Sequence, residues 1–252
     1  GQWDEDSTIP GPAVLDLPQT EVGLPNSHPG ACGPNDEVTL AVAMQDSCNT
    51  AFGWLGMELG GDAMREQASK FGFGEELDVP MQVTPSTLPE EMSPAQEAQV
   101  GIGQYDVRVT PLQVAMVSAA VANDGVVMKP HLVQSVLGSD LSTLSETKPE
   151  QLSTAMEPET SDQLTSMMEL VVEQGTGTQA AVPGTSVAGK TGTAEHEEGK
   201  APHAWFTGFA PADNPQIAVA VVVEDGGRAG NEAYGGSVAG PISAAVMEAA
   251  LK

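Results

Sequence analysis

The stretch Val187-Ala188-Gly189-Lys190-Thr191-Gly192-Thr193-Ala194 constrains this chain more than any other. It places one fixed cation, two hydroxyl groups and two glycines within eight residues. Glycine lets another backbone or a ligand approach where a side chain would block it. The stretch is therefore suited to holding an anionic substrate.

A nucleotide-binding loop is one interpretation, because residues 184–191 (GTSVAGKT) match the pattern G-x-x-x-x-G-K-S/T. Such a loop must leave a buried strand and open a helix, whose amides then hold the phosphates. Here Pro183 and Gly184 interrupt the preceding run, and the following residues 192–203 contain two glycines and a proline with no apolar period. We expect no helix there, so a P-loop nucleotidase remains only an alternative.

The other interpretation makes residues 186–194 a strand, with Lys190 and Thr193 along the edge of a cleft. Serine acyltransferases that act on D-Ala-D-Ala peptides and β-lactams carry S-x-x-K, then an S-x-N type motif, then K-T-G. This chain has Lys190-Thr191-Gly192 and, far upstream, Ser47-Cys48-Asn49. The order of the two motifs favours the acyltransferase interpretation.

Four ordered segments extend this similarity over nearly the whole chain. They are SCNTAFG (47–53), GIGQ with VTPLQVA (101–104 and 109–115), AGKTGTAE (188–195) and HAWFTGFAP (203–211). Together they resemble the transpeptidase domain of actinobacterial class B penicillin-binding proteins. The resemblance implies a peptidoglycan D,D-transpeptidase that acts on D-Ala-D-Ala stem peptides, is acylated by β-lactams and needs no cofactor. A non-catalytic module that binds cell-wall peptide or a partner protein is the second alternative.

The pattern of apolar residues and turn signals predicts an α+β fold, with an antiparallel β-sheet flanked by helices and an all-helical subdomain. We expect an irregular N-terminal segment at 1–36 and a transpeptidase domain at 37–252, mainly helical over 37–130 and sheet with packing helices over 131–252. The predicted strands are 186–194, 204–210 and 216–224. The predicted helices are 37–44, 50–59, 62–71, 111–123, 160–175 and 238–251, with a further helix entry at Ser93-Pro94 and loops at 74–93 and 138–158.

The resemblance also implies a role for each matching residue. Ser47 would pass a proton to the leaving amine, and Asn49 would hydrogen-bond the amide of the substrate. Lys190 would lower the pKa of this hydroxyl network and attract the substrate carboxylate, which the hydroxyl groups of Thr191 and Thr193 would bind. The backbone N–H of Thr193 would be one oxyanion donor, and Gly192 would keep the strand face clear. Helix capping alone would also explain Ser47 and Asn49.

One element of the pattern is missing, because no S-x-x-K precedes Ser47. The single S-x-x-K, Ser145 to Lys148, lies downstream in a polar stretch and is followed by Pro149, so we interpret it as chance. We therefore expect the chain to be a C-terminal portion, inactive alone, whose upstream segment supplies the nucleophile and a strand against 216–224. Without that strand, the apolar run 217–223 would be an exposed edge prone to aggregation.

The balance of 9 Lys+Arg against 35 Asp+Glu gives a formal charge of −26. This charge argues against nucleic acid or an anionic membrane as a partner. No apolar run approaches the roughly 20 residues of a spanning helix, so we expect the chain as given to be soluble. The resemblance implies an extracytoplasmic domain, membrane-anchored in the full-length protein, with a membrane glycosyltransferase as partner.

Cys32 and Cys48 are the two cysteines of the chain. Their even number and the implied exported location favour a disulfide between them. Two reduced, buried thiols are the alternative.

His196 and His203, with Glu195, Glu197 and Glu198, suggest a metal site. These residues fall in the loop after the K-T-G strand, where a solvated turn is the simpler interpretation, so we expect no metal.

Overall fold

The computed structural model describes residues 2–77, 79–197 and 199–252. Its centre is an antiparallel sheet of β9 (Ala188–Ala194), β10 (His203–Ala210) and β11 (Ile217–Val223), in the order β11-β10-β9. All three strands were predicted, with ends that differ by one or two residues. Lys190 therefore lies within a strand, which contradicts the loop that a nucleotide site requires.

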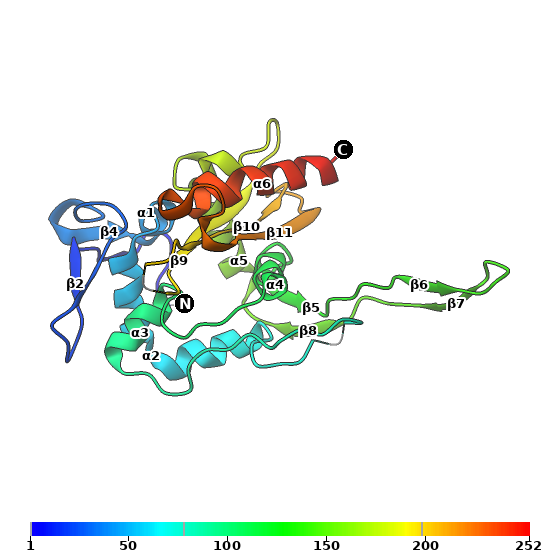
Figure 1. Ribbon diagram of the computed structural model, residues 1–252, viewed down its shortest axis with the longest axis horizontal. Helices are drawn as coiled ribbons and strands as arrows, with labels where there is room; N and C mark the ends of the chain where they lie inside the picture. Colours follow the sequence, from blue (N-terminus) through cyan, green and yellow to red (C-terminus); the bar gives the residue numbers. More distant parts are fainter. Residues whose placement is uncertain (1, 78, 198) are drawn as a thin grey trace.

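Helices cover both faces of this sheet (Figure 1). Helix α6 (Gly235–Ala250) packs on one face, while α4 (Pro111–Val121) and α5 (Pro158–Glu173) pack on the other. Side chains alternate across a strand, so Phe206 joins the core beneath α6 and Phe209 joins the core beneath α4 and α5; both are fully buried. The sheet is thus a covered layer that holds β9 rigidly at its edge.

A helical subdomain lies beside the sheet. It contains α1 (Leu40–Gln45), α2 (Asn49–Lys70) and α3 (Pro94–Gly101). Prolines begin α3 and α4 as predicted, with Ser93 forming a capping box and the Thr110 hydroxyl accepting from the Gln113 amide. Helix α1 begins later than expected, because Glu37–Thr39 forms strand β4 and Thr39 is the N-cap.

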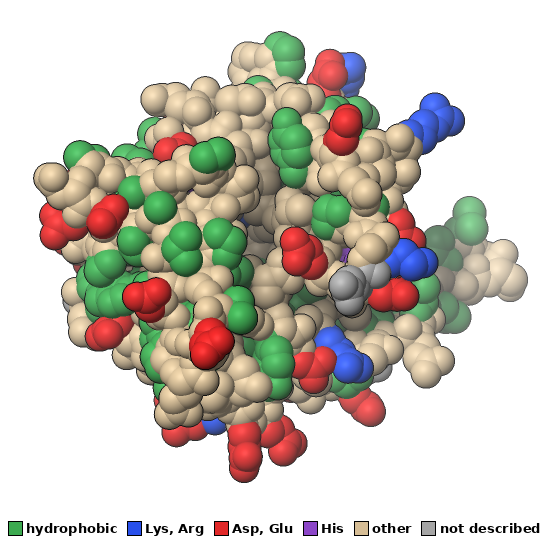
Figure 2. Space-filling view, turned by 60° about the vertical axis from the view of Figure 1, so that its left-hand side comes forward, with side chains coloured by type: hydrophobic (Ala, Val, Ile, Leu, Met, Phe, Trp, Pro, Cys, Tyr) green, Lys and Arg blue, Asp and Glu red, His purple; other side chains and the backbone are tan. Residues whose placement is uncertain are grey.

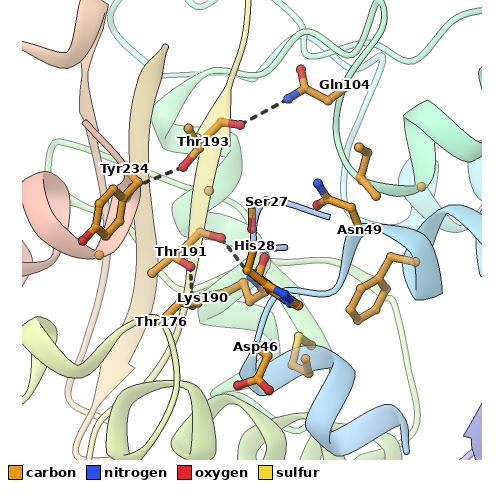
Figure 3. Close-up of a pocket in the computed structure, with 18 residues that line it drawn as sticks. Ser27, His28, Asp46, Asn49, Gln104, Thr176, Lys190, Thr191, Thr193 and Tyr234 are labelled. Atoms are coloured by element: carbon orange, nitrogen blue, oxygen red, sulfur yellow. Dashed lines mark hydrogen bonds between the residues drawn. The ribbon is translucent and has the colours of Figure 1, made fainter. Parts of the chain in front are cut away.

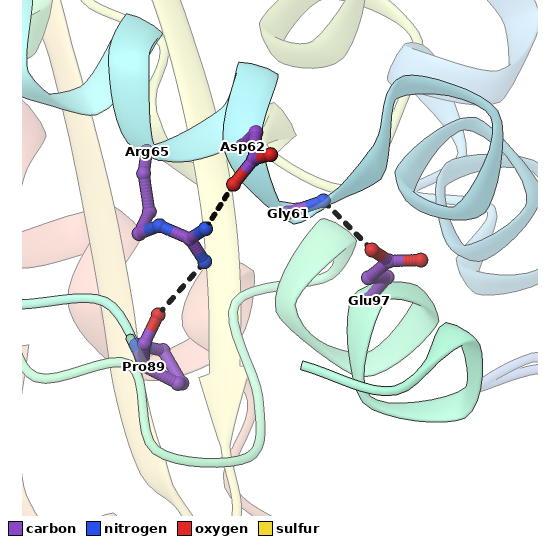
Figure 4. Close-up of polar contacts among 5 residues, drawn as sticks. All are labelled: Gly61, Asp62, Arg65, Pro89 and Glu97. Atoms are coloured by element: carbon purple, nitrogen blue, oxygen red, sulfur yellow. Dashed lines mark hydrogen bonds and ion pairs between the residues drawn. The ribbon is translucent and has the colours of Figure 1, made fainter. Parts of the chain in front are cut away.

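Helix α2 is broken at Gly60, whose φ of 77° and ψ of 160° leave the helical region. The two predicted helices around Gly60-Gly61 are therefore continuous except at this residue. The break frees the Gly61 amide, which donates to the Glu97 carboxylate on α3 at 2.8 Å (Figure 4). Arg65 pairs with Asp62 and donates to the Pro89 carbonyl at 3.3 Å, which fixes the loop between α2 and α3.

Short strands replace two of the predicted irregular segments. Residues 1–36 contain β1 (Thr8–Pro10), β2 (Val14–Asp16) and β3 (Gly23–Pro25); β1 pairs with β4, and β2 pairs with β3. The region 138–158 contributes β7 (Thr143–Glu146) and β8 (Gln151–Thr154), which pair with β6 (Ser135–Leu137) and β5 (Val126–Met128). The expectation of irregular structure is wrong in both places, while the domain boundary at residue 36 stays a prediction.

Strands β6 and β7 form a hairpin that projects from the body of the molecule (Figure 1). Both strands are exposed along their whole length. This hairpin carries Ser145, so the chance S-x-x-K lies on an exposed arm.

Two helices begin earlier than their sequence signals suggested. Helix α5 begins at Pro158 after the N-cap Glu157, and α6 begins at Gly235 after Tyr234, which leaves Pro241 inside the helix. No helix among the described residues has the length and apolar character that crossing a bilayer requires.

A disulfide joins Cys32 to Cys48, with their Cα atoms 6.1 Å apart. Cys48 is the N-cap of α2 and is fully buried. The bond therefore ties the loop before β4 to the turn between α1 and α2.

A buried hydroxyl pair joins α4 to the sheet. Ser118 is 1% exposed, and its Oγ lies 2.6 Å from Thr207 Oγ1 on β10. Replacing Ser118 with Ala should lower the free energy of unfolding by about 1 kcal/mol, since one buried hydrogen bond is lost. Urea unfolding measures this change, with the exposed Ser69→Ala on α2 as the control, expected to stay within about 0.5 kcal/mol of wild type. Equal stability of S118A and wild type would contradict the contribution of this pair.

Candidate active site

A cavity of about 610 Å³ separates β9 from the helical subdomain. Its walls include the turn at Ser47, the start of α2, the loop after α3 and the N-terminus of α6. Figure 2 shows a hollow in the molecular surface, with Asp and Glu side chains spread over the faces around it. Among the described residues that line the cavity, Lys190 is the one lysine or arginine, so it supplies a local positive charge in an acidic chain.

Ser47 and Lys190 meet across this cavity although they are 143 residues apart. Lys190 Nζ donates to Ser47 Oγ at 2.7 Å and to the Thr191 carbonyl at 3.0 Å. Ser47 has a φ of 56°, a left-handed conformation that is uncommon outside glycine. This sharp turn between α1 and α2 directs the hydroxyl group of Ser47 toward the sheet.

Burial lowers the pKa of Lys190 from 10.5 to about 8, because removing the ammonium from water disfavours its charged form. The folded chain therefore releases this proton at a lower pH than the unfolded chain does. The penalty for burying the charge is fully present below pH 8 and disappears as the pH rises from about 8 to 10.5.

The titration of Lys190 gives a direct test. The ¹³Cε chemical shift of Lys190 should change with a midpoint near pH 8, whereas an ordinary lysine titrates near 10.5. The variant Lys190→Arg assigns the signal by removing it and keeps a fixed positive charge. A midpoint near 10.5 would show that the ammonium is not desolvated.

Successive side chains of β9 point to opposite faces of the sheet. Thr191 and Thr193 face the α6 side of the sheet, whereas Lys190 lies on the opposite face. Thr191 Oγ1 lies 2.6 Å from Thr176 Oγ1, and Thr193 Oγ1 accepts from the Gly235 amide at 3.4 Å (Figure 3). Two threonine hydroxyls and the positive end of the α6 dipole thus gather at one end of the cavity, an arrangement that favours an anion.

Glycines allow α6 to begin this close to β9. A Cβ on Gly235 would lie 2.1 Å from the Trp205 carbonyl oxygen and 2.6 Å from that of Gly192. A Cβ on Gly192 would meet Trp205 Cβ at 3.2 Å. Gly192 therefore lies directly beneath the start of α6, in a space that side chains would close.

The edge of β9 that does not pair with β10 faces the cavity. Gln104 Nε2, from the loop after α3, donates to the Thr193 carbonyl at 3.2 Å. In an antiparallel pair, the N–H and C=O of one residue point to the same side, so the Thr193 amide also points away from β10 and toward the cavity. Asn49 lies opposite this edge (Figure 3), and its Nδ2 donates to the Pro25 carbonyl at 3.2 Å.

The structure thus brings Ser47, Asn49, Lys190, Thr191, Gly192 and Thr193 to one cavity. It also places there residues that were not predicted as site residues, among them Ser27, His28, Asp46, Gln104, Thr176 and Tyr234. Gln104 belongs to the GIGQ segment, which had served only to identify a family. The other five carried no distinctive sequence signal.

His196 and His203 lie outside this cavity, beside Asp225. Glu198, named with them in the sequence, lies outside the described residues.

Comparisons with known proteins find similarity over nearly the whole chain. The family model described as "Penicillin binding protein transpeptidase domain" matches residues 18–248. The peptidoglycan D,D-transpeptidase PbpA of Mycolicibacterium smegmatis is 44% identical over 240 residues, which are 94% of this chain and 48% of that protein. PbpA of Mycobacterium tuberculosis is 41% identical over 95% of this chain and 49% of its own length. The chain therefore spans about half the length of these curated relatives.

Solved structures show the same similarity. Penicillin-binding protein A of M. tuberculosis, as its acyl-enzyme complex with ceftriaxone, matches with a TM-score of 0.93 and 40% identity, over 98% of this chain and 56% of that chain. The D,D-transpeptidase domain of a peptidoglycan glycosyltransferase from Eggerthella lenta matches with a TM-score of 0.86 and 33% identity, over 98% of this chain and 60% of that one.

Proposed function

Because the chain belongs to the penicillin-binding protein transpeptidase family, we propose that it forms the part of a peptidoglycan D,D-transpeptidase that binds the D-Ala-D-Ala end of a stem peptide. The contact between Lys190 Nζ and Ser47 Oγ at 2.7 Å carries this proposal. This contact joins the K-T-G strand to the S-x-N turn. An acyltransferase that moves a proton through a hydroxyl group requires such a contact.

The substrate carboxylate binds at the α6 end of the cavity. Lys190 supplies the charge, and the hydroxyl groups of Thr191 and Thr193 supply hydrogen bonds beside the N-terminus of α6. Gly192 leaves room for this close approach. The supporting observations are the position of the Gly235 amide against Thr193 and the Thr176–Thr191 hydroxyl pair.

The scissile carbonyl lies against the outer edge of β9. The Thr193 N–H, which points into the cavity, donates to the oxyanion as negative charge develops there. Asn49, on the opposite wall, hydrogen-bonds the amide of the substrate. Ser47 passes a proton to the leaving amine, and Lys190 keeps the Ser47 hydroxyl oriented by donating to its oxygen.

The nucleophilic serine is assigned to no residue of this chain. Ser145, in the single S-x-x-K, lies on the exposed β6–β7 hairpin and does not line the cavity. The activity, its peptidoglycan and β-lactam ligands, an extracytoplasmic location and a membrane glycosyltransferase partner therefore belong to the proposal for the whole protein.

Fluorescent penicillin labelling of a full-length protein that carries this chain tests the proposal. We expect one covalent label per molecule, blocked by unlabelled penicillin. If a folded protein with an intact S-x-x-K fails to label, the transpeptidase assignment is wrong, and binding of cell-wall peptide without catalysis becomes the function to examine.

A further inference from the structure

Two imidazoles and a carboxylate meet where the three sheet strands end. His203 begins β10, His196 follows the last residue of β9 by two positions, and Asp225 follows the last residue of β11 by two positions. The two histidine rings stack with centroids 3.9 Å apart and planes at 11°. Asp225 Oδ1 lies 3.0 Å from His196 Nε2 and 4.0 Å from His203 Nδ1.

These separations suit a metal ion held between the three side chains. Zinc binds nitrogen and carboxylate oxygen at about 2.0–2.2 Å in tetrahedral geometry, which places two ligand atoms roughly 3.3 Å apart. The distances of 3.0 Å and 4.0 Å lie on either side of this value, and one ligand atom from each of the three residues lies within 4.8 Å of the others. The two rings are nearly parallel, at 11°, and an imidazole lone pair lies in the plane of its ring, so the rings must tilt toward each other before both nitrogens can face one ion.

One nitrogen of His203 is already directed toward Asp225. Its Nδ1 accepts the Asp225 amide N–H at 3.0 Å, so the lone pair of this nitrogen points toward the residue that supplies the carboxylate. A metal ligand needs such a nitrogen. The histidine side chains are 29% and 27% exposed, so they are partly shielded and still open to an ion from solution.

We propose that His196, His203 and Asp225 form a binding site for a divalent transition metal, with zinc as the ion that this donor set favours. Mixed imidazole and carboxylate donors suit zinc, whereas calcium and magnesium prefer oxygen ligands alone. Water takes the fourth position. The ion lies between His196 Nε2 and Asp225, the two rings tilt so that their lone pairs converge, and His203 exchanges its amide hydrogen bond for the metal.

A bound metal ion would cross-link the strands of the sheet beside the cavity. The three ligands follow or begin β9, β10 and β11 at the same end of the sheet, and His203 pairs with Ala194, the neighbour of Thr193. A metal there would join all three strands one residue from the proposed oxyanion donor. The sequence had suggested only a solvated turn because Asp225 is remote from the two histidines along the chain.

Titration of a metal-free, full-length protein that carries this chain with ZnCl₂, followed by calorimetry and by melting temperature, tests the site. We expect one saturable site per chain, a rise in melting temperature that EDTA reverses, and no comparable effect of MgCl₂, which controls for the acidic surface. His196→Ala should weaken zinc binding by more than the roughly 10–100-fold that losing an outer-shell partner costs. His131→Ala removes an exposed histidine elsewhere and should bind zinc as wild type does.

Asp225→Asn provides a second variant, since Asp225 is exposed and the change preserves its size. It should lose zinc affinity while its melting temperature without metal stays close to that of wild type. The proposal is overturned if no saturable zinc site exists, or if H196A and D225N bind zinc as tightly as the wild-type chain. The titration does not depend on penicillin labelling, so it is independent of the proposed function.

Discussion

Replacing Lys190 with Ala in a full-length protein that carries this chain should reduce the rate of penicillin acylation by about 10²–10³-fold, as loss of a preorganised group at the reacting centre does. The change removes the donor to Ser47 Oγ and the charge that, in our proposal, attracts the substrate carboxylate. It also removes a buried ammonium, so the folded state should not be destabilised by an unpaired charge. Labelling rates with fluorescent penicillin measure the effect.

Two variants sharpen this test. Lys252→Ala removes an exposed lysine at the end of α6 and should label at the wild-type rate. Lys190→Arg keeps the positive charge with a different shape, so it separates the need for charge from the need for a small donor to Ser47. If K190A is folded and labels at nearly the wild-type rate, Lys190 has no part in the reaction.

Removal of the Cys32–Cys48 disulfide should lower the free energy of unfolding by roughly 3 kcal/mol, the value of the chain-entropy model for a loop of this size. The effect should reach the cavity as well. Cys48 lies between Ser47 and Asn49, and Cys32 follows the loop that brings Ser27 and His28 to the cavity wall. Cleaving the bond therefore loosens two walls together.

Denaturant unfolding of the chain with and without reductant measures this contribution. The double variant Cys32→Ala/Cys48→Ala is the matched control, because reductant should no longer change its unfolding midpoint. Two free thiols, found by titration under denaturing and non-reducing conditions, would contradict the bond.

The long, uniform elements could be predicted from the sequence. The apolar run of β11 and the buried helix α4 each carry a signal over seven or more residues, and Pro94 and Pro111 mark helix entries by their fixed φ. The Ser47 turn was predicted because helical patterns end and restart around it. The proximity of Ser47 to Lys190 could be expected only from the family resemblance, because no sequence periodicity relates residues so far apart.

The short elements could not be predicted. Strands β1 to β4 contain three residues each, too few to show a period of two. The residues of β4 were predicted to start a helix because Asn35-Asp36 precede them as a capping signal, whereas the N-cap is Thr39. The cluster of His196, His203 and Asp225 depends on the register of β10 with β9 and β11. Such contacts exist only in the folded sheet.

The projecting β6–β7 hairpin has a consequence for the dynamics of the molecule. Its strands bond only to each other among the described elements, and Leu137, Leu141 and Leu144 pack against no buried core. Its amides should therefore exchange with deuterium through local opening, without the global unfolding that β10 requires. Because the hairpin opens independently, its tip at residues 138–141 is a position where a fluorophore or an inserted peptide can report on the protein without disturbing the cavity.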